Sequence, residues 1–251
     1  MLLRAENLSK SFGGVAALQD VALELEPGMV HAIIGPNGAG KTTLLNLLSG
    51  VYRPDNGRIF FDDEEMTGAP HDFSAAGIGR TFQNLQVFFN MSALENVMAG
   101  RWQHERCSLA AALLRLPALA RGERRSREAA YELLELVGLS RWADHASNAL
   151  PYGALKRLEI ARALGAKPKL LLLDEPAAGL NPTETRDIDR LIREVAARGI
   201  TVVLVEHNMK LVMEVSEHVV VLDYGRKLAE GAPRSVSDDP RVIEAYLGCS
   251  A

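Results

Sequence analysis

Four short apolar runs along the chain predict buried β-strands. Each run is bounded by glycine, proline or acidic residues, and uninterrupted apolar runs of this length are typical of strands that are covered on both faces. The segments between them have helical periodicity, as in 183–199, which ends at a glycine. Alternation of strand and helix predicts a mostly parallel α/β sheet. The four runs are MVHAIIG at 29–35, LLLLDEP at 170–176, TVVLVEH at 201–207 and VVVLDYG at 219–225.

Two other parts of the chain have different patterns. The segments VALELEPG at 21–28 and GRIFFDD at 57–63 alternate apolar and polar residues and end in turns, which predicts an antiparallel accessory sheet. The region 92–166 is rich in alanine, leucine and arginine with helical spacing. We interpret it as an α-helical subdomain inserted into one domain that covers residues 1–251.

Composition restricts the class of protein. The 251 residues are 47% hydrophobic and 24% charged, as in a folded domain with a solvated surface, and the net charge of −4 gives no basic footprint for nucleic acid. The distant residues Cys107 and Cys249 make no disulfide framework, so we expect a reducing cytosol. Arg4 and Glu6 interrupt the first residues, which argues against a signal peptide, and no uncharged apolar run reaches the roughly 18 residues that a bilayer span needs.

A phosphate-binding loop stands between the first buried strand and a helix. The stretch GPNGAGKTT at 35–43 matches G-x-x-x-x-G-K-T in its required strand–turn–helix context. Its glycines let backbone N–H groups approach phosphate oxygens, and the new helix directs its positive end at the anion. Lys41 supplies a charge for the β- and γ-phosphates, Thr42 can bind Mg²⁺, and Thr43 can donate to a phosphate. We therefore expect ATP and Mg²⁺ at Gly35, Pro36, Asn37, Gly38, Ala39, Gly40, Lys41, Thr42 and Thr43.

Two carboxylates follow the second buried strand. Asp174 stands at its carboxyl end, where α/β sheets bind ligands, and there it can hold Mg²⁺ through water. Glu175 comes next and is suited to polarise a water that attacks the γ-phosphate. Neighbouring carboxylates need a compensating cation, which Mg²⁺ and Lys41 would provide.

These motifs, in this order, resemble those of the ABC-type ATPases over essentially the whole chain. The resemblance implies a P-loop NTPase (RecA-like) core with the accessory sheet and the helical insert. It also implies that Phe12, in KSFGG, stacks on adenine, although a core phenylalanine is the alternative. Gln83, in RTFQN, would reach Mg²⁺ and the attacking water. His207, in LVEHN, would contact the γ-phosphate and steady Glu175, whereas a lone histidine is more often structural.

The segment LPYGA at 150–154 corresponds to the family's signature, commonly Leu-Ser-Gly-Gly-Gln. Here Pro151 replaces the serine, Tyr152 the first glycine and Ala154 the glutamine, while Gly153 and the following helix remain. The resemblance implies that Pro151, Tyr152 and Gly153 face ATP bound to the other ATPase of a dimer. Loss of the hydroxyl donor would weaken that contact by roughly ten- to a hundredfold and would make two sites unequal in a heterodimer. The alternative is that proline is tolerated at a helix start and backbone donors suffice.

Several longer stretches look like the ATP-binding subunits of branched-chain amino-acid uptake systems. That resemblance implies an importer with a second ATPase subunit, identical or different, two transmembrane permeases and an extracytoplasmic solute-binding protein. The chain would then lie at the cytoplasmic face of a bacterial inner membrane. Urea, amides or aromatic acids are alternative solutes, and a soluble ABC ATPase or a phosphotransferase is a poorer fit. The stretches are GIGRTFQNLQVFFNMSALENVMAG, LDEPAAGLNPTET, VEHNMKLVMEVSEHVVVLDYGRKLAEGAP and DDPRVIEAYLG.

An apolar segment follows Gln83. We expect a surface there on which a permease helix docks, and packing inside the helical insert is the alternative. Its residues are Leu85, Val87, Phe88 and Phe89.

Overall fold

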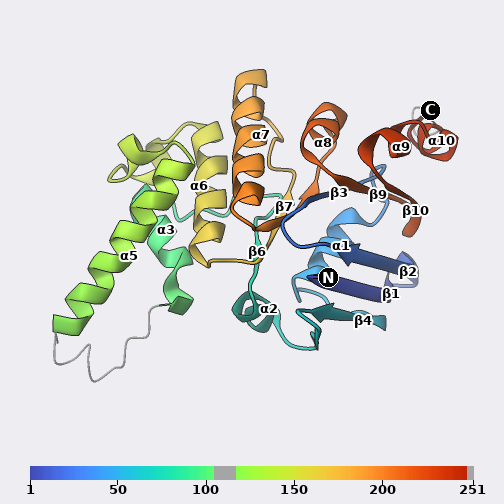
Figure 1. Cartoon of the computed structure of the whole chain (residues 1–251), viewed down its shortest axis with the longest axis horizontal. Coiled ribbons are helices and arrows are strands. Elements are labelled where there is room, and N and C mark those ends of the chain that lie inside the picture. Colours follow the sequence, from blue (N-terminus) through green and yellow to red (C-terminus); the bar gives the residue numbers. More distant parts are fainter. Residues whose placement is uncertain (105–116, 248–251) are drawn as a thin grey trace. The chain divides into compact units, whose positions relative to one another are not determined.

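The computed structural model describes residues 1–104 and 117–247 (Figure 1). Cys107 and Cys249 lie outside these residues. The chain divides into two compact units, one formed by Met1–Arg80 with Lys169–Ala251 and the other by Thr81–Pro168. The second unit contains the range 92–166, for which the sequence predicts a helical insert.

A six-stranded sheet forms the centre of the first unit, in the order β10-β9-β3-β8-β7-β6. Five neighbouring strands are parallel, and only the edge strand β10 runs antiparallel to β9. The strands β3, β7 and β8 are buried throughout, as their uninterrupted apolar sequences predict. The strands are β3 (Val30–Ile34), β6 (Ile78–Arg80), β7 (Leu170–Asp174), β8 (Thr201–Val205), β9 (His218–Asp223) and β10 (Arg226–Gly231).

A second, antiparallel sheet of four strands has the order β2-β1-β4-β5. The predicted segment 57–63 overlaps most of β4, the predicted segment 21–28 overlaps only the last five residues of β2, and the sequence does not predict β1, the strand between them. Leucine and phenylalanine side chains of this sheet share one hydrophobic cluster with leucines of α1, so the sheet packs against the helix that follows the phosphate-binding loop. The strands are β1 (Leu3–Phe12), β2 (Val15–Leu25), β4 (Asn56–Phe61) and β5 (Glu64–Glu65).

The helices of the first unit follow its strands. In α7 the Asn181 side chain accepts hydrogen bonds from the N–H groups of Thr183 and Glu184, which begins the helix. The apolar positions of this helix are buried at the spacing that the sequence shows, and Gly199 follows its end with φ +85°. The helices are α1 (Lys41–Leu48), α2 (Pro70–Ala76), α7 (Pro182–Ala197), α8 (Met209–Val215), α9 (Pro233–Ser237) and α10 (Pro240–Leu247).

The second unit is built from helices. Asn96 is fully buried and joins them: its amide donates to Ser147 Oγ over 2.9 Å and to the Phe88 carbonyl over 3.0 Å. The helix α3 packs against both α5 and α6. The elements are α3 (Ala93–Gly100), η1 (Trp102–His104), α5 (Pro117–Leu136), η2 (Ser140–Trp142), η3 (Ser147–Ala149) and α6 (Tyr152–Gly165).

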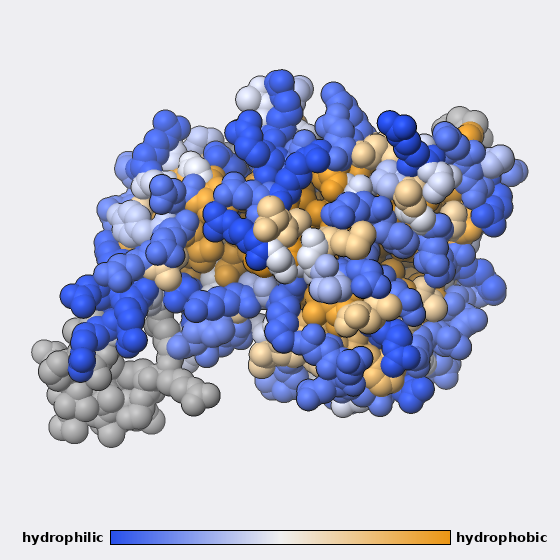
Figure 2. All heavy atoms as spheres, viewed as in Figure 1, coloured by the Kyte–Doolittle hydropathy of each residue, from blue (hydrophilic) through white to orange (hydrophobic). Residues whose placement is uncertain are grey.

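Charged and polar side chains cover much of the face that Figure 2 shows, with apolar residues between them. Across residues 1–104 and 117–247, no helix has both the length and the apolar character that a membrane crossing requires.

Candidate nucleotide-binding site

The turn from β3 into α1 has a backbone that only glycine adopts without strain. Gly35, Gly38 and Gly40 have φ values of +151°, +81° and +100°. A Cβ atom on Gly40 would lie 2.6 Å from the Ala17 carbonyl oxygen, and one on Gly35 would lie 2.1 Å from that of Leu222. The loop is thus held closely against the backbone of Ala17 and Leu222.

The N-terminus of α1 suits an anion. Gly40 caps the helix without a side-chain hydrogen bond, and no acidic residue stands in the first turn. The orphan N–H groups of that turn and the positive end of the helix therefore have no anionic partner within the helix. Thr42 is exposed there and Thr43 is half-buried, and the roles of the two hydroxyls in binding Mg²⁺ and phosphate stay predictions.

Lys41 is 7% exposed, and its Nζ donates to the carbonyl oxygens of Gly35 over 2.7 Å and Pro36 over 2.9 Å. The ammonium therefore lies on the loop itself. Burial lowers the pKa of Lys41, and the negative charges of Glu175 and Asp174 act in the opposite direction. The negative charges of Glu175 and Asp174 thus act on the Lys41 ammonium and favour its charged form.

We expect Gly40→Ala to weaken nucleotide binding by at least about tenfold, because a Cβ at this position meets both a strained φ and a backbone oxygen. Gly199→Ala is the matched control, since Gly199 also has a positive φ, +85°, no atom lies within 4 Å of the added Cβ, and the residue lies outside the phosphate-binding loop. Fluorescent ATP titration measures both variants. Equal losses in the two would show that space at Gly40 does not matter.

Asp174 ends β7 and is 1% exposed. Arg80, the last residue of β6, places Nη2 3.4 Å from Asp174 Oδ2. Its Nη1 donates to Asn46 Oδ1 and Ser49 Oγ, each over 2.7 Å, and both acceptors belong to or cap α1. Arg80 thus compensates the buried carboxylate and ties it to the helix of the phosphate-binding loop.

Asp174 and Thr42 carry oxygen donors, the kind of ligand that Mg²⁺ prefers, and Mg²⁺ needs few protein carboxylates. Asp174 offers a buried carboxylate and Thr42 an exposed hydroxyl. When bound, the ion would neutralise charge on the phosphates. The metal roles of Thr42, Gln83 and Asp174 stay predictions.

Glu175 and His207 come together in the structure. His207 Nε2 lies 2.6 Å from Glu175 Oε1, so the imidazole donates to the carboxylate. Glu175 has φ +50°, a left-handed conformation that costs a residue of this kind free energy. Its N–H donates to the Val205 carbonyl over 2.9 Å, which helps to hold this conformation. The contact between Glu175 and His207 agrees with the resemblance of the sequence to ABC-type ATPases, and the role of the pair in hydrolysis stays a prediction.

Phe12 is the last residue of β1 and is 42% exposed. Its ring forms a T-shaped contact with the ring of Tyr52, with ring centroids 5.1 Å apart. This exposure contradicts the alternative of a core phenylalanine and leaves a face on which a base could stack. Tyr52 is an aromatic neighbour for which the sequence gives no signal, because it lies 40 residues after Phe12.

The remaining predicted residues belong to the second unit. Gln83 is exposed in a segment without helix or strand. Pro151 is the N-cap of α6 and forms no side-chain cap, Tyr152 is 47% exposed, and Gly153 is buried. Within this unit the buried carboxylate of Glu159 accepts the N–H groups of Phe82 and Gln86, both over 3.3 Å, and so holds the segment that carries Gln83.

The predicted docking surface is smaller than its sequence suggests. Phe88 and Phe89 are 46% and 47% exposed, and Leu85 is half-buried. Val87 is buried among the core residues, so the prediction that it belongs to the docking surface is wrong. The exposed pair alone remains a candidate contact.

Comparison with known proteins identifies the family. The profile of the ABC transporter family matches residues 18–178, a range that includes the phosphate-binding loop, Asp174 and Glu175. The chain belongs to the ABC transporter family. A second profile, of branched-chain amino acid ATP-binding cassette transporters, matches residues 226–248.

Individual proteins are similar to this ABC chain over nearly its whole length. The high-affinity branched-chain amino acid transport ATP-binding protein BraF of Pseudomonas aeruginosa is 45% identical and covers 98% of both chains. The crystal structure of the ADP conformation of MJ1267, an ATP-binding cassette, is 36% identical with a TM-score of 0.86 and covers 98% of both chains. A dimeric post-hydrolysis structure of the cassette MJ0796, bound to ADP and phosphate, is 27% identical with a TM-score of 0.78 and covers 93% of this chain and 99% of that one. The predicted ABC-type fold is confirmed.

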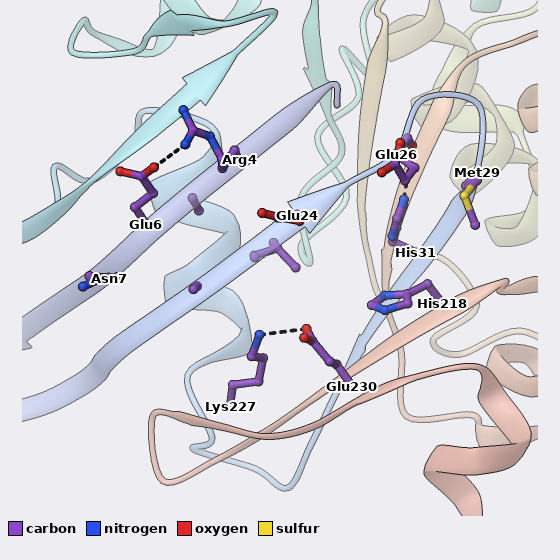
Figure 3. A pocket seen from close by; sticks show the side chains of 13 residues that line it. Arg4, Glu6, Asn7, Glu24, Glu26, Met29, His31, His218, Lys227 and Glu230 are labelled. Atoms are coloured by element: carbon purple, nitrogen blue, oxygen red, sulfur yellow. Dashed lines mark hydrogen bonds and ion pairs between the residues drawn. The ribbon is translucent and has the colours of Figure 1, made fainter.

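A cavity of about 510 Å³ lies elsewhere in the first unit of this ABC chain, between the two sheets (Figure 3). It contains none of the residues of the nucleotide site. Two ion pairs line it, Arg4 with Glu6 and Lys227 with Glu230. Beside them the rings of His31 and His218 meet edge to face, with centroids 5.7 Å apart.

His31 gives the protein a predicted sensitivity to acid. It is 2% exposed, and its Nε2 lies 3.2 Å from the Glu26 carbonyl oxygen, so the neutral ring carries its proton there. Burial lowers the pKa of His31 below 6.5, and the nearby His218 adds to the shift, while Glu26 and Glu217 oppose it. The unfolded chain therefore takes up this proton at a higher pH than the folded chain does.

As the pH falls below about 6.5, uptake of that proton favours the unfolded state, so stability that is present above this pH is lost. We expect His31→Gln, which keeps an N–H for Glu26 but cannot titrate, to lose less stability than the wild type between about pH 7.5 and pH 5.5. Urea unfolding at the two pH values measures the difference. Equal losses would contradict the role of His31.

Proposed function

We propose that this chain is the ATP-hydrolysing subunit of an importer for branched-chain amino acids. The full-length similarity to a branched-chain amino acid transport ATP-binding protein carries the proposal, and the match of residues 226–248 to the corresponding cassette profile supports it. Urea, amides and aromatic acids are the alternative solutes, and no residue described above distinguishes them from leucine.

In this proposal the phosphate-binding loop and Lys41 hold the phosphates of ATP, and Phe12 stacks on the base. Asp174, Thr42 and Gln83 hold Mg²⁺. Glu175 orients a water for in-line attack on the γ-phosphate, and His207 fixes Glu175 through the 2.6 Å hydrogen bond.

Coupling to transport requires partners. Two ATPase chains would pair head to tail, so that Pro151, Tyr152 and Gly153 of one chain cover ATP on the other. ATP then binds the closed dimer better than the open one, and this differential affinity drives closure. Two permeases at the membrane and an extracytoplasmic solute-binding protein complete the importer, and the chain works at the cytoplasmic face.

Solute uptake tests the proposal. Deleting the gene in its host should lower uptake of radiolabelled leucine, isoleucine and valine at least about tenfold at low external concentration, and uptake should return when the wild-type gene is restored. Urea, amide and aromatic acid uptake are measured in parallel. Unchanged leucine uptake with loss of one of these would assign the chain to that solute instead.

We expect Phe89→Asp to abolish most leucine transport and to leave ATP binding intact, because a charge on an exposed aromatic side chain disrupts an apolar contact without opening the core. Trp102→Asp is the control, since Trp102 is 77% exposed in the same unit but lies outside the segment 85–89. Transport and nucleotide titration are compared in both variants. Normal transport by the Phe89 variant would exclude this residue from the docking surface.

A further inference from the structure

A second glutamate stands next to the proposed reaction centre. Glu206 directly follows β8 and is 4% exposed. Its Oε1 accepts the N–H of Ala177 over 2.8 Å, and its Oε2 accepts the N–H groups of His207 over 3.1 Å and Asn208 over 3.4 Å. Burial raises the pKa of Glu206, while the three N–H groups lower it and the charge of Glu175 raises it further. The carboxylate therefore sits in a pocket of backbone donors.

These hydrogen bonds join two loops. Ala177 lies in the turn that begins at Glu175, and His207 is the residue after Glu206. The turns leave the neighbouring parallel strands β7 and β8. The Glu206 carboxylate thus connects the backbone of Ala177, two residues after Glu175, to the backbone of His207.

We propose that Glu206 is a positioning residue for ATP hydrolysis, which sets the contact between Glu175 and His207 by holding the Ala177 and His207 N–H groups on its two oxygens. The inference rests on the proposed function, because it acts through Glu175 and His207. Glu206 itself is buried behind the loops and bonds only backbone groups in the hydrogen bonds described.

The chemistry of the pocket requires a carboxylate. An ionised carboxylate accepts on both oxygens, whereas an amide accepts on one side and would direct its NH₂ group at an N–H donor on the other. Aspartate keeps the charge but is shorter by one carbon–carbon bond, about 1.5 Å, so it cannot serve both loops at the present distances. Glu206→Gln and Glu206→Asp therefore remove the link in two different ways.

We expect both variants to lower kcat for ATP by about 10- to 100-fold, since a displacement near 1 Å in a reacting group has an effect of this size. KM for ATP should change less than about threefold, because the phosphate-binding loop is untouched. Glu214→Gln is the control: this carboxylate is exposed on α8 and should leave kcat unchanged. Wild-type kcat in Glu206→Gln overturns the inference; if that variant does not fold, wild-type kcat in Glu206→Asp does so.

A double-mutant cycle separates positioning from general stability. If Glu206 acts through His207, Glu206→Gln should lower kcat less than about twofold in a His207→Ala background. If the double variant instead lowers kcat by the product of the two separate effects, Glu206 acts by another route and the inference is overturned. Failure of the proposed function is seen separately, as absence of ATP hydrolysis in the wild-type chain assembled with its permeases.

Discussion

Glu175→Gln should lower ATP turnover by about 10²- to 10⁴-fold, the range typical of a lost general base. Its side chain is 17% exposed and receives the His207 hydrogen bond over 2.6 Å, which leaves a carboxylate oriented but still open to water. The amide keeps the size of the side chain and loses the negative charge. Nucleotide affinity should stay within about threefold of the wild type, because Lys41 and the glycine loop are unchanged.

Phosphate release and fluorescent ATP titration measure the two quantities on the transporter complex. Glu194→Gln is the control, because Glu194 is an exposed carboxylate on α7 that pairs with Arg198. Turnover of the Glu175 variant near that of the control would exclude Glu175 as the residue that activates water.

Arg80→Met should lower the free energy of unfolding by about 3–5 kcal/mol, the usual effect of removing one partner of a buried ion pair. Arg80 and Asp174 have side-chain exposures of 7% and 1%, so water cannot replace the lost guanidinium. The substitution also removes donors from Asn46 and Ser49. The buried Asp174 carboxylate would then lose the positive charge that pairs with it.

Urea unfolding without nucleotide measures this loss. Arg190→Met is the matched control, since Arg190 is 78% exposed and pairs with Asp187 at 3.8 Å, and its loss should change stability by no more than about 0.5 kcal/mol. An Arg80 variant as stable as the control would mean that Asp174 is compensated by other groups.

The buried strands were predictable because burial on both faces leaves a continuous apolar run. The strand β1 was not, since Asn7 has φ +51° and the register with β2 shifts between Ala5 and Leu8, which breaks the alternation on which such a prediction depends. The strand β6 has three residues, too few for a period. The edge strand β10 is exposed or half-buried throughout, so it carries no apolar run.

The candidate nucleotide site likewise contains residues that the sequence predicts and residues that it does not. The glycine loop is local in sequence, and its backbone requirements are visible there. Arg80 and Glu206 escape sequence reasoning, because a charged residue at a strand end is usually exposed. Their burial depends on partners 94 residues away for Arg80 and 29 residues away for Glu206. The sequence signal for these residues is their position: Arg80 is the first residue of the segment RTFQN, and Glu206 immediately precedes His207.

The ring of Phe12 has one further consequence. A phenyl face carries no hydrogen-bond donor or acceptor, and the described neighbours of this ring are the ring of Tyr52 and the ammonium of Lys10, 5.7 Å from the ring centroid. Stacking there would hold guanine about as well as adenine. The choice between GTP and ATP would then follow their cellular concentrations rather than any discrimination by this contact.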